Sequence, residues 1–212
     1  MHQEDVAQVT EIDREAFSTQ WPPPNYQREL RNRLTHYIVA YDKEKTIDEP
    51  EVKTSSEKSL TGLVARLRRL FSRNRFFSNE LPPPSRHCII GFAGLWVMAD
   101  EAHITSIAVR EAYRRQGIGE LLLISLISLA TEQKTCIVTL EVRASNATAQ
   151  TLYSKYSFTQ ASVRRGYYVD NREDAILMST ENITSAPFQA HLQQLKQAHF
   201  RKWGIALSKI TR

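Results

Sequence analysis

Glycine, cysteine and long apolar segments are all scarce in this chain. Its 212 residues include seven glycines and two cysteines. No run of about 18 consecutive apolar residues occurs, so the sequence shows no sign of a membrane-spanning helix. The polar start, residues 1–5, has the features of neither a signal peptide nor a transit peptide. We therefore expect a soluble, cytoplasmic protein.

The cysteines and histidines show no spacing that is typical of a metal site or a disulfide. Cys88 and Cys136 each lie in an apolar, strand-like run, where a small core residue is the usual interpretation. Five histidines are too dispersed to form a set of ligands: His36, His87, His103, His191 and His199. We expect no metal ion.

Positive charge is concentrated in two segments. Residues 60–87 hold six arginines and one glutamate, and residues 182–212 hold five basic residues and no acidic one. The rest of the chain carries 17 basic and 22 acidic residues, so an acidic body bears two basic appendages. The appendages favour polyanions and the acidic body favours cations. Together with the length, this predicts one domain over residues 1–181, with an insertion at about 43–87, and a basic extension over 182–212.

The first basic segment has the pattern of an amphipathic helix. Leu60, Leu63, Val64, Leu67, Leu70 and Phe71 form one apolar stripe, and most arginines of residues 60–77 lie elsewhere on the helix. The stripe suits packing on the protein's own domain, an anionic membrane surface or an RNA backbone. The pattern does not distinguish these three.

Outside the insertion, the periodicity predicts alternating helices and strands. Helices are expected at about 5–17, 26–34, 117–132, 147–156 and 188–203. Strands are expected at about 36–42, 88–98, 102–109, 136–142, 163–169 and 175–179, the second bent at Gly91 and Gly94 and forming a hairpin with the third. The helix at 117–132 is apolar on most sides, so we expect it to be buried against a sheet.

The segment from Arg114 to Glu120 has the pattern of an anion-binding turn. It follows the strand ending at Val109 and begins a helix, whose first N–H groups lack intrahelical partners and attract phosphate. Gly117 and Gly119 permit close approach of a ligand to the backbone. The segment lacks the Lys-Ser/Thr ending of a P-loop and the third glycine of a dinucleotide fingerprint.

Four further motifs accompany this turn: Leu140-Glu141-Val142-Arg143-Ala144-Ser145-Asn146, Leu152-Tyr153, Arg164-Arg165-Gly166-Tyr167-Tyr168 and Arg172-Glu173-Asp174-Ala175. With them the chain resembles the GNAT superfamily of acetyl-CoA-dependent N-acetyltransferases, and within it the RimI-like ribosomal-protein alanine N-acetyltransferases. The resemblance implies an α/β GNAT fold, in which helices flank a central, twisted, mixed and largely antiparallel sheet. The basic insertion and the basic C-terminal helix would be additions to this fold.

The resemblance also implies where acetyl-CoA binds. Pantetheine would pair with the backbone between splayed strands, and pyrophosphate would bind the N–H groups that open the helix. The cofactor-binding residues implied are Ile107, Ala108, Val109, Arg115, Gln116, Gly117, Ile118, Gly119, Glu120 and Asn146. A helix start holds phosphate without particular side chains, which agrees with the interpretation of the turn.

By the same resemblance Glu141 is the proton acceptor and Tyr153 the proton donor. The chemistry suits both. An α-amine has a pKa of about 7.7–8.0, so a carboxylate can collect its proton, and a phenol with a pKa near about 10 can donate to a thiolate. The alternatives are that Glu141 is a surface carboxylate and Tyr153 a core residue, with Tyr156 as a second candidate donor. Tyr167 and Tyr168 suit either packing or the peptide site.

Three features depart from the family pattern. The chain begins almost directly at the first helix, so the usual first strand is short or missing. Ser157 stands where a glycine is usual, and Glu120 stands where the family often has a basic or small residue.

The resulting hypothesis is an acetyl-CoA-dependent N-terminal acetyltransferase acting on an alanine of a small-subunit ribosomal protein. We expect a monomer whose segments 60–77 and 182–212 contact a ribosome, RNA or an anionic membrane. The alternatives are acetylation of a small amine or a lysine side chain, and a non-catalytic acyl-CoA-binding adaptor.

Overall fold

The computed structural model describes residues 1–17, 24–46, 87–204 and 210–211. The predicted basic helix at residues 60–77, its apolar stripe and most of the insertion lie outside these residues. Within them, no helix is both long and apolar enough to cross a membrane.

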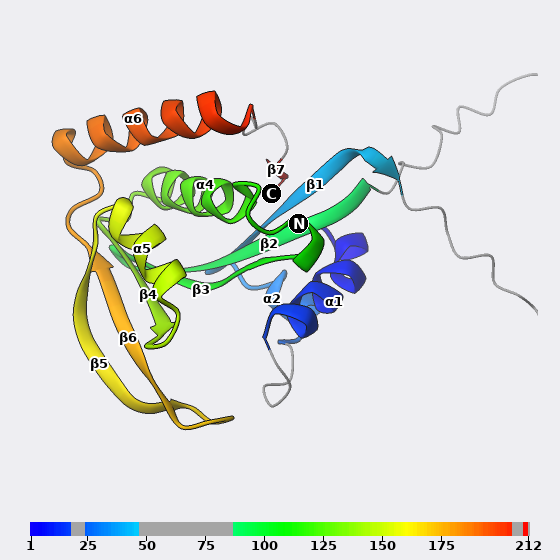
Figure 1. The fold of residues 1–212 in the computed structure, drawn as a ribbon, viewed down its shortest axis with the longest axis horizontal. Coiled ribbons are helices and arrows are strands. Elements are labelled where there is room, and N and C mark those ends of the chain that lie inside the picture. Colours follow the sequence, from blue (N-terminus) through cyan, green and yellow to red (C-terminus); the bar gives the residue numbers. More distant parts are fainter. Residues whose placement is uncertain (18–23, 47–86, 205–209, 212) are drawn as a thin grey trace, which may run out of the picture.

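A seven-stranded mixed sheet forms the centre of the fold, in the order β5-β6-β4-β3-β2-β1-β7 (Figure 1). The strands β3 and β4 are parallel, and the other neighbouring pairs are antiparallel. The strands are β1 (Thr35–Thr46), β2 (His87–Met98), β3 (Glu101–Val109), β4 (Ile137–Arg143), β5 (Phe158–Tyr168), β6 (Glu173–Thr180) and β7 (Ile210–Thr211). This agrees with the fold class that the sequence predicted.

Helices cover both faces of the sheet. They are α1 (Val6–Ala16), α2 (Tyr26–Glu29), α4 (Ile118–Glu132), α5 (Ala147–Lys155) and α6 (Ala186–Trp203), with short 3-10 turns at η1 (Gln3–Asp5) and η2 (Glu111–Tyr113). Figure 1 shows α4 and α5 on one face, α1 and α2 on the other, and α6 along the outer side of α4. Because α4 lies between the sheet and α6, its apolar residues are buried on several sides, as the sequence predicted.

Two apolar clusters lie on opposite faces of the sheet. The larger cluster packs α4 against β1, β2, β3 and β4, and α6 contributes Leu192. The smaller cluster packs α1 and Tyr26 against the other face of β1, β2 and the end of β3, where Ala108 lies. In β4, Val138, Leu140 and Val142 are buried, whereas Glu141 lies on the opposite face, as the alternation of the sequence predicted.

The described elements differ from the sequence prediction in three places. The helix expected at 26–34 ends at Glu29, and a turn leads into β1. The strand expected at 163–169 begins earlier, at Phe158, and forms a long hairpin with β6. The third difference is the strand β7, which the sequence did not predict and which lies beside β1, where Val39 pairs with Thr211; no strand precedes α1 among the described residues, in agreement with the sequence.

The parallel strands β3 and β4 separate partway along their length. They pair from Glu101 and Ile137 as far as Ile104 and Leu140, and beyond this point β3 pairs only with β2 and β4 only with β6. The end of β3 and the end of β4 therefore leave a gap in the sheet's hydrogen bonding. The start of α4 follows the end of β3, so this gap opens towards the predicted anion-binding turn.

Candidate active site

The turn before α4 presents a row of unpaired N–H groups. The backbone N–H groups of residues 115–120 donate to no acceptor among the described residues, and the helical bonds begin with Leu121 donating to the Gly117 carbonyl. Arg115 and Gly117 both have positive φ, at 62° and 79°, which turns the chain sharply into the helix. An anion placed here meets several donors and the positive end of the helix dipole. The backbone geometry therefore provides the unpaired N–H donors on which the predicted anion site depends.

Helix α6 holds this turn from outside. The His199 imidazole donates from Nε2 to the Gly117 carbonyl at 3.0 Å, and His199 is buried. The Trp203 indole packs directly on Gly117, because a Cβ built there would lie 2.7 Å from Trp203 Cδ1. Glycine is required at position 117 for two reasons: its φ is left-handed, and the Trp203 indole occupies the space that a side chain would need. The C-terminal helix is thus part of the support of the turn.

Glu120 does not place an uncompensated charge beside the turn. Its carboxylate accepts hydrogen bonds from Lys155 Nζ at 2.6 Å and from the Tyr156 hydroxyl at 2.8 Å. Burial raises the pKa of the Glu120 carboxyl, but the two hydrogen bonds and the nearby positive charge together outweigh burial, so the pKa is lowered. The carboxylate therefore stays ionised, and its negative charge is paired with the ammonium group of Lys155.

Alternate backbone groups of β3 face the gap beside β4. Arg110 donates its N–H to the Ile90 carbonyl, and Phe92 is paired with Ala108. In an antiparallel ladder the residues between such pairs turn their N–H and C=O groups to the other side. Ile107 and Val109 therefore present these groups to the gap, whereas those of Ala108 face β2. The Val109 carbonyl accepts a hydrogen bond from Arg114 Nε at 3.1 Å. Of the three residues predicted to pair with pantetheine, Ile107 therefore offers its N–H and carbonyl groups to the gap, and Val109 offers its N–H group.

Glu141 lies between two basic side chains. His103 Nε2 is 2.9 Å from Glu141 Oε2, and Arg164 Nη2 is 3.0 Å from Oε1. The Glu141 side chain is only 9% exposed, whereas those of His103 and Arg164 are 25% and 50% exposed. The carboxylate is therefore neither free nor at the open surface, which argues against a surface carboxylate without a role.

The two candidate proton donors lie in different surroundings. Burial raises the pKa of Tyr153 to about 12, and its hydroxyl has no hydrogen-bond partner among the described residues. The Tyr156 hydroxyl is held by Glu120, and burial followed by this bond raises its pKa far beyond the usual value. Both phenols keep their protons at neutral pH, but Tyr153 alone has a hydroxyl that is available to a ligand.

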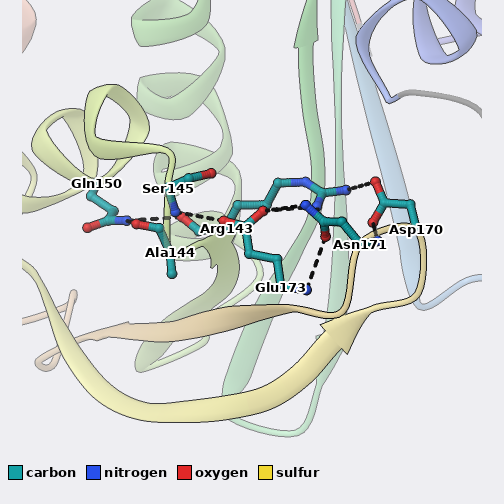
Figure 2. Close-up of polar contacts among 7 residues, drawn as sticks. All are labelled: Arg143, Ala144, Ser145, Gln150, Asp170, Asn171 and Glu173. Carbon is teal, nitrogen blue, oxygen red and sulfur yellow. Dashed lines mark hydrogen bonds and ion pairs between the residues drawn. The ribbon is translucent and has the colours of Figure 1, made fainter.

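Asn146 begins α5 and caps it. Its Oδ1 accepts the Ala149 N–H at 3.1 Å, so its amide NH₂ group is the part that remains for a ligand. The carbonyls of Arg143 and Ala144, which precede Asn146 in the sequence, both accept hydrogen bonds from Gln150 Nε2 at 3.0 Å (Figure 2). The end of β4 and the first turn of α5 are therefore fastened together around Asn146.

Arg143 joins the end of β4 to the β5–β6 hairpin. Its guanidinium donates to Asp170 at 2.8 Å and to Glu173 at 3.2 Å, and it lies 3.9 Å from the centre of the Tyr168 ring. Glu173 also accepts the Ser145 N–H at 2.7 Å (Figure 2). Three of the four sequence motifs that accompany the turn thus meet in one structural network beside the site.

Comparisons with known proteins agree with this arrangement. The family model described as the acetyltransferase (GNAT) family matches residues 66–158. A protein of Bacillus subtilis (strain 168), provisionally named a ribosomal protein bS18-alanine N-acetyltransferase, is 31% identical over 179 residues, which are 84% of this chain and 90% of that protein. The chain belongs to the acetyltransferase (GNAT) family. The bS18-alanine N-acetyltransferase of Escherichia coli (strain K12) is 47% identical over 90 residues, 42% of this chain and 61% of that protein.

A solved structure also supports the assignment of this chain to the GNAT family. The crystal structure of the ribosomal-protein-S18-alanine N-acetyltransferase from E. coli aligns with a TM-score of 0.58 and 26% identity, over 86% of this chain and 90% of that one. The resemblance that the sequence motifs indicated is therefore confirmed at the level of fold and family.

The sequence did not reveal several residues around the site of this acetyltransferase. His103 and Arg164 contact Glu141 because β3 and β5 lie on either side of β4 and β6, which no local pattern indicates. His199 and Trp203 reach the turn through the packing of α6 on α4. Glu101 and His103 are two residues apart on β3, so their side chains lie on the same face of the sheet. This spacing was the only sequence signal that these two residues lie together.

Proposed function

We propose that this protein transfers the acetyl group of acetyl-CoA to the N-terminal α-amine of an alanine in a ribosomal protein, in the cytoplasm. The observation that carries the proposal is the row of free N–H groups at residues 115–120, which opens onto the gap between β3 and β4 with Glu141 on β4. The acceptor is inferred from the names of the relatives from B. subtilis and E. coli.

The chain's own residues suit the binding of acetyl-CoA, which supplies the activated acetyl group. The N–H groups of Arg115, Gln116, Gly117, Ile118, Gly119 and Glu120 bind the pyrophosphate. Ile107 and Val109 pair with pantetheine through backbone groups, the side chain of Ala108 supports them from the opposite face, and the Asn146 amide donates from the other side of the gap. In this proposal the Val109 N–H is the donor that stabilises negative charge on the thioester oxygen.

Glu141 receives the proton of the attacking amine. As the nitrogen bonds to the acetyl carbon, its proton passes to the carboxylate, and the carbon–sulfur bond then breaks. Tyr153 donates its hydroxyl proton to the departing thiolate, which its raised pKa of about 12 permits because the phenol is fully protonated beforehand. Two protons therefore move in the reaction: the amine proton passes to Glu141, and the Tyr153 hydroxyl proton passes to the thiolate.

The charge distribution suits a basic protein substrate. Outside its two basic segments the chain has 22 acidic and 17 basic residues, so a basic terminus is attracted to the body. The segments 60–77 and 182–212 favour contact with ribosomal RNA, and the protein acts as a monomer. We propose that Tyr167 contacts the incoming peptide, because its side chain is 43% exposed and the charge of Glu141 contributes to its raised pKa.

A panel of amines tests the proposal directly. Purified protein with acetyl-CoA is offered an alanine-initiating ribosomal peptide, the same peptide with a blocked N-terminus, a lysine-containing peptide and small amines. Acetylation of the first alone supports the proposal, and preference for lysine or a small amine assigns the same chemistry to another acceptor. Tight binding of acetyl-CoA without acetylation of any amine would instead support the alternative of a non-catalytic adaptor that binds acyl-CoA.

A variant tests the role of Glu141 within this scheme. Glu141→Gln keeps the size of the side chain but removes the charge that accepts a proton. We expect unchanged acetyl-CoA binding and a turnover lowered by about 100-fold or more. Unchanged turnover would remove Glu141 from the mechanism.

A further inference from the structure

A chain of hydrogen bonds runs from Glu101 to Glu141. Thr139 donates its hydroxyl proton to Glu101 Oε1 at 2.6 Å, and Thr139 Oγ1 lies 2.8 Å from His103 Nδ1. On the other side of the ring, His103 Nε2 lies 2.9 Å from Glu141 Oε2. The groups come from adjacent parallel strands, because His103 of β3 is paired with Thr139 of β4.

The protons in this chain can be counted. A threonine hydroxyl has one proton, and a carboxylate only accepts, so the Thr139 proton is used by Glu101. Thr139 must then accept at the other contact, which places a proton on His103 Nδ1. A neutral imidazole has only one N–H, so its Nε2 is then a bare acceptor that faces a second acceptor, Glu141. At 2.9 Å this contact is attractive only when one further proton lies between the two, so the observed distance corresponds to the pair after it has taken up a proton.

We propose that Glu141 and His103 form a single proton-accepting pair, and that Glu101 and Thr139 fix the imidazole tautomer that leaves Nε2 open to Glu141. This inference rests on the proposed function, since the proton it accepts is that of the attacking amine. His103 acts through Glu141 and is a positioning residue, whereas Glu141 is the catalytic residue.

The pair explains how a carboxylate beside two basic groups still accepts a proton. Without the shared proton, the lone pairs of Nε2 and Oε2 oppose each other, and this repulsion is relieved when the amine proton arrives. The nitrogen–carbon bond forms as the nitrogen–hydrogen bond breaks, and the proton is shared by Oε2 and Nε2. After the product leaves, the partly exposed His103 edge lets water remove this proton.

The other charged groups around the pair are accounted for. Arg164 of β5 contacts the second oxygen of Glu141 at 3.0 Å, and Tyr167 of the same strand is influenced by the Glu141 charge. Glu101, at the start of β3, is exposed and bonded through Thr139. The Arg164 contact leaves Oε2 to His103, so the two oxygens have separate partners.

Two pairs of variants test the proposal by kinetics. His103→Gln keeps a hydrogen-bond donor for Glu141 but cannot share a proton, so we expect kcat to fall about 10- to 100-fold while KM for acetyl-CoA is unchanged. Added imidazole restores part of the activity of His103→Ala. Thr139→Val lowers kcat similarly, and Thr139→Ser retains it. The matched controls His191→Gln and Thr151→Val, at exposed helical positions outside the site, keep wild-type kcat.

Nitrogen-15 NMR of the imidazole tests the proton count without any substrate. In the neutral form of His103 we expect a protonated Nδ1 and a bare Nε2, and in Thr139→Val a return to the protonated Nε2. A neutral wild-type ring protonated on Nε2, or full activity of His103→Gln, overturns the proposal. If the wild-type protein acetylates no amine, the proposed function fails on its own, and the NMR spectrum still decides whether the tautomer is fixed as proposed.

Discussion

Substitution of the two glycines of the turn tests separately its contribution to stability and its proposed role in binding acetyl-CoA. Gly117 has a φ of 79° and carries the Trp203 indole, whose atoms Cδ1, Cγ and Nε1 would lie 2.7–2.8 Å from a new Cβ. Gly119 lies in the first turn of α4, and the nearest atom to its Cβ, Val109 Cγ2, is 3.8 Å away, which is an ordinary contact. Alanine is therefore strained at the first position and accommodated at the second.

The expected magnitudes follow from these contacts. In Gly117→Ala the left-handed backbone costs about 1–2 kcal/mol, and displacing the indole costs about 1–3 kcal/mol more. The sum of about 2–5 kcal/mol lowers Tm by roughly 10 °C in a chain of this size. Gly119→Ala replaces a helical glycine and is expected to stabilise by up to about 1 kcal/mol, unless fraying at the first turn reduces the gain.

Unfolding and binding are measured on the same samples. Denaturant titration gives the free energy of unfolding, and calorimetry gives the Kd for acetyl-CoA. We expect Gly117→Ala to lose both stability and affinity. Gly119→Ala keeps its stability but loses affinity, because its Cβ enters the space where the phosphate approaches the backbone.

Removal of the indole divides the cost at Gly117 into its two parts. In a Trp203→Ala background, Gly117→Ala should lose only the backbone cost of about 1–2 kcal/mol, and the difference from the wild-type background measures the clash. Equal costs in both backgrounds would show that Trp203 does not press on the turn. Full stability of Gly117→Ala would refute the whole explanation.

Three other predictions concern residues near the site. Ser157 has a φ of 64°, so Ser157→Gly should raise Tm by a few degrees as it removes about 1 kcal/mol of left-handed strain, and an unchanged or lower Tm would contradict this. Tyr153→Phe should lower kcat by about 100-fold without loss of stability. Tyr156→Phe should instead lower stability, because it removes the hydrogen bond from the Tyr156 hydroxyl to Glu120. Equal effects of the two substitutions would reject Tyr153 as the proton donor. The pKa of Glu173 is lowered from 4.5 to about 2 by its bonds to Ser145, so the stability that it contributes is present above pH 4.5 and is lost as pH falls towards 2. Glu173→Gln should therefore flatten the decline of Tm in this window, and an unaltered decline would assign it to other carboxylates.

Local patterns predicted most of the fold. The apolar period of α4, the alternation along β4 and the turn after β3 each depend on residues close in sequence, and the structure contains all three. The helix expected at 26–34 was too long, because its C-terminal half forms the turn that aims the chain into β1. Its residues had helical propensity, but tertiary contacts decided where the helix ended.

The sequence by itself determined the turn with unpaired N–H groups before α4, the face on which Glu141 lies and, through its motifs, the family. These features need only short-range geometry: a strand, two glycines and a helix start, or the period of two along a strand. Only the tertiary structure brought His103 and Arg164 to Glu141 and Trp203 to Gly117. The physical reason is that strand order, strand register and helix packing are set by the burial of whole apolar faces, so contacts between residues tens of positions apart appear only when the sheet and its covering helices are assembled.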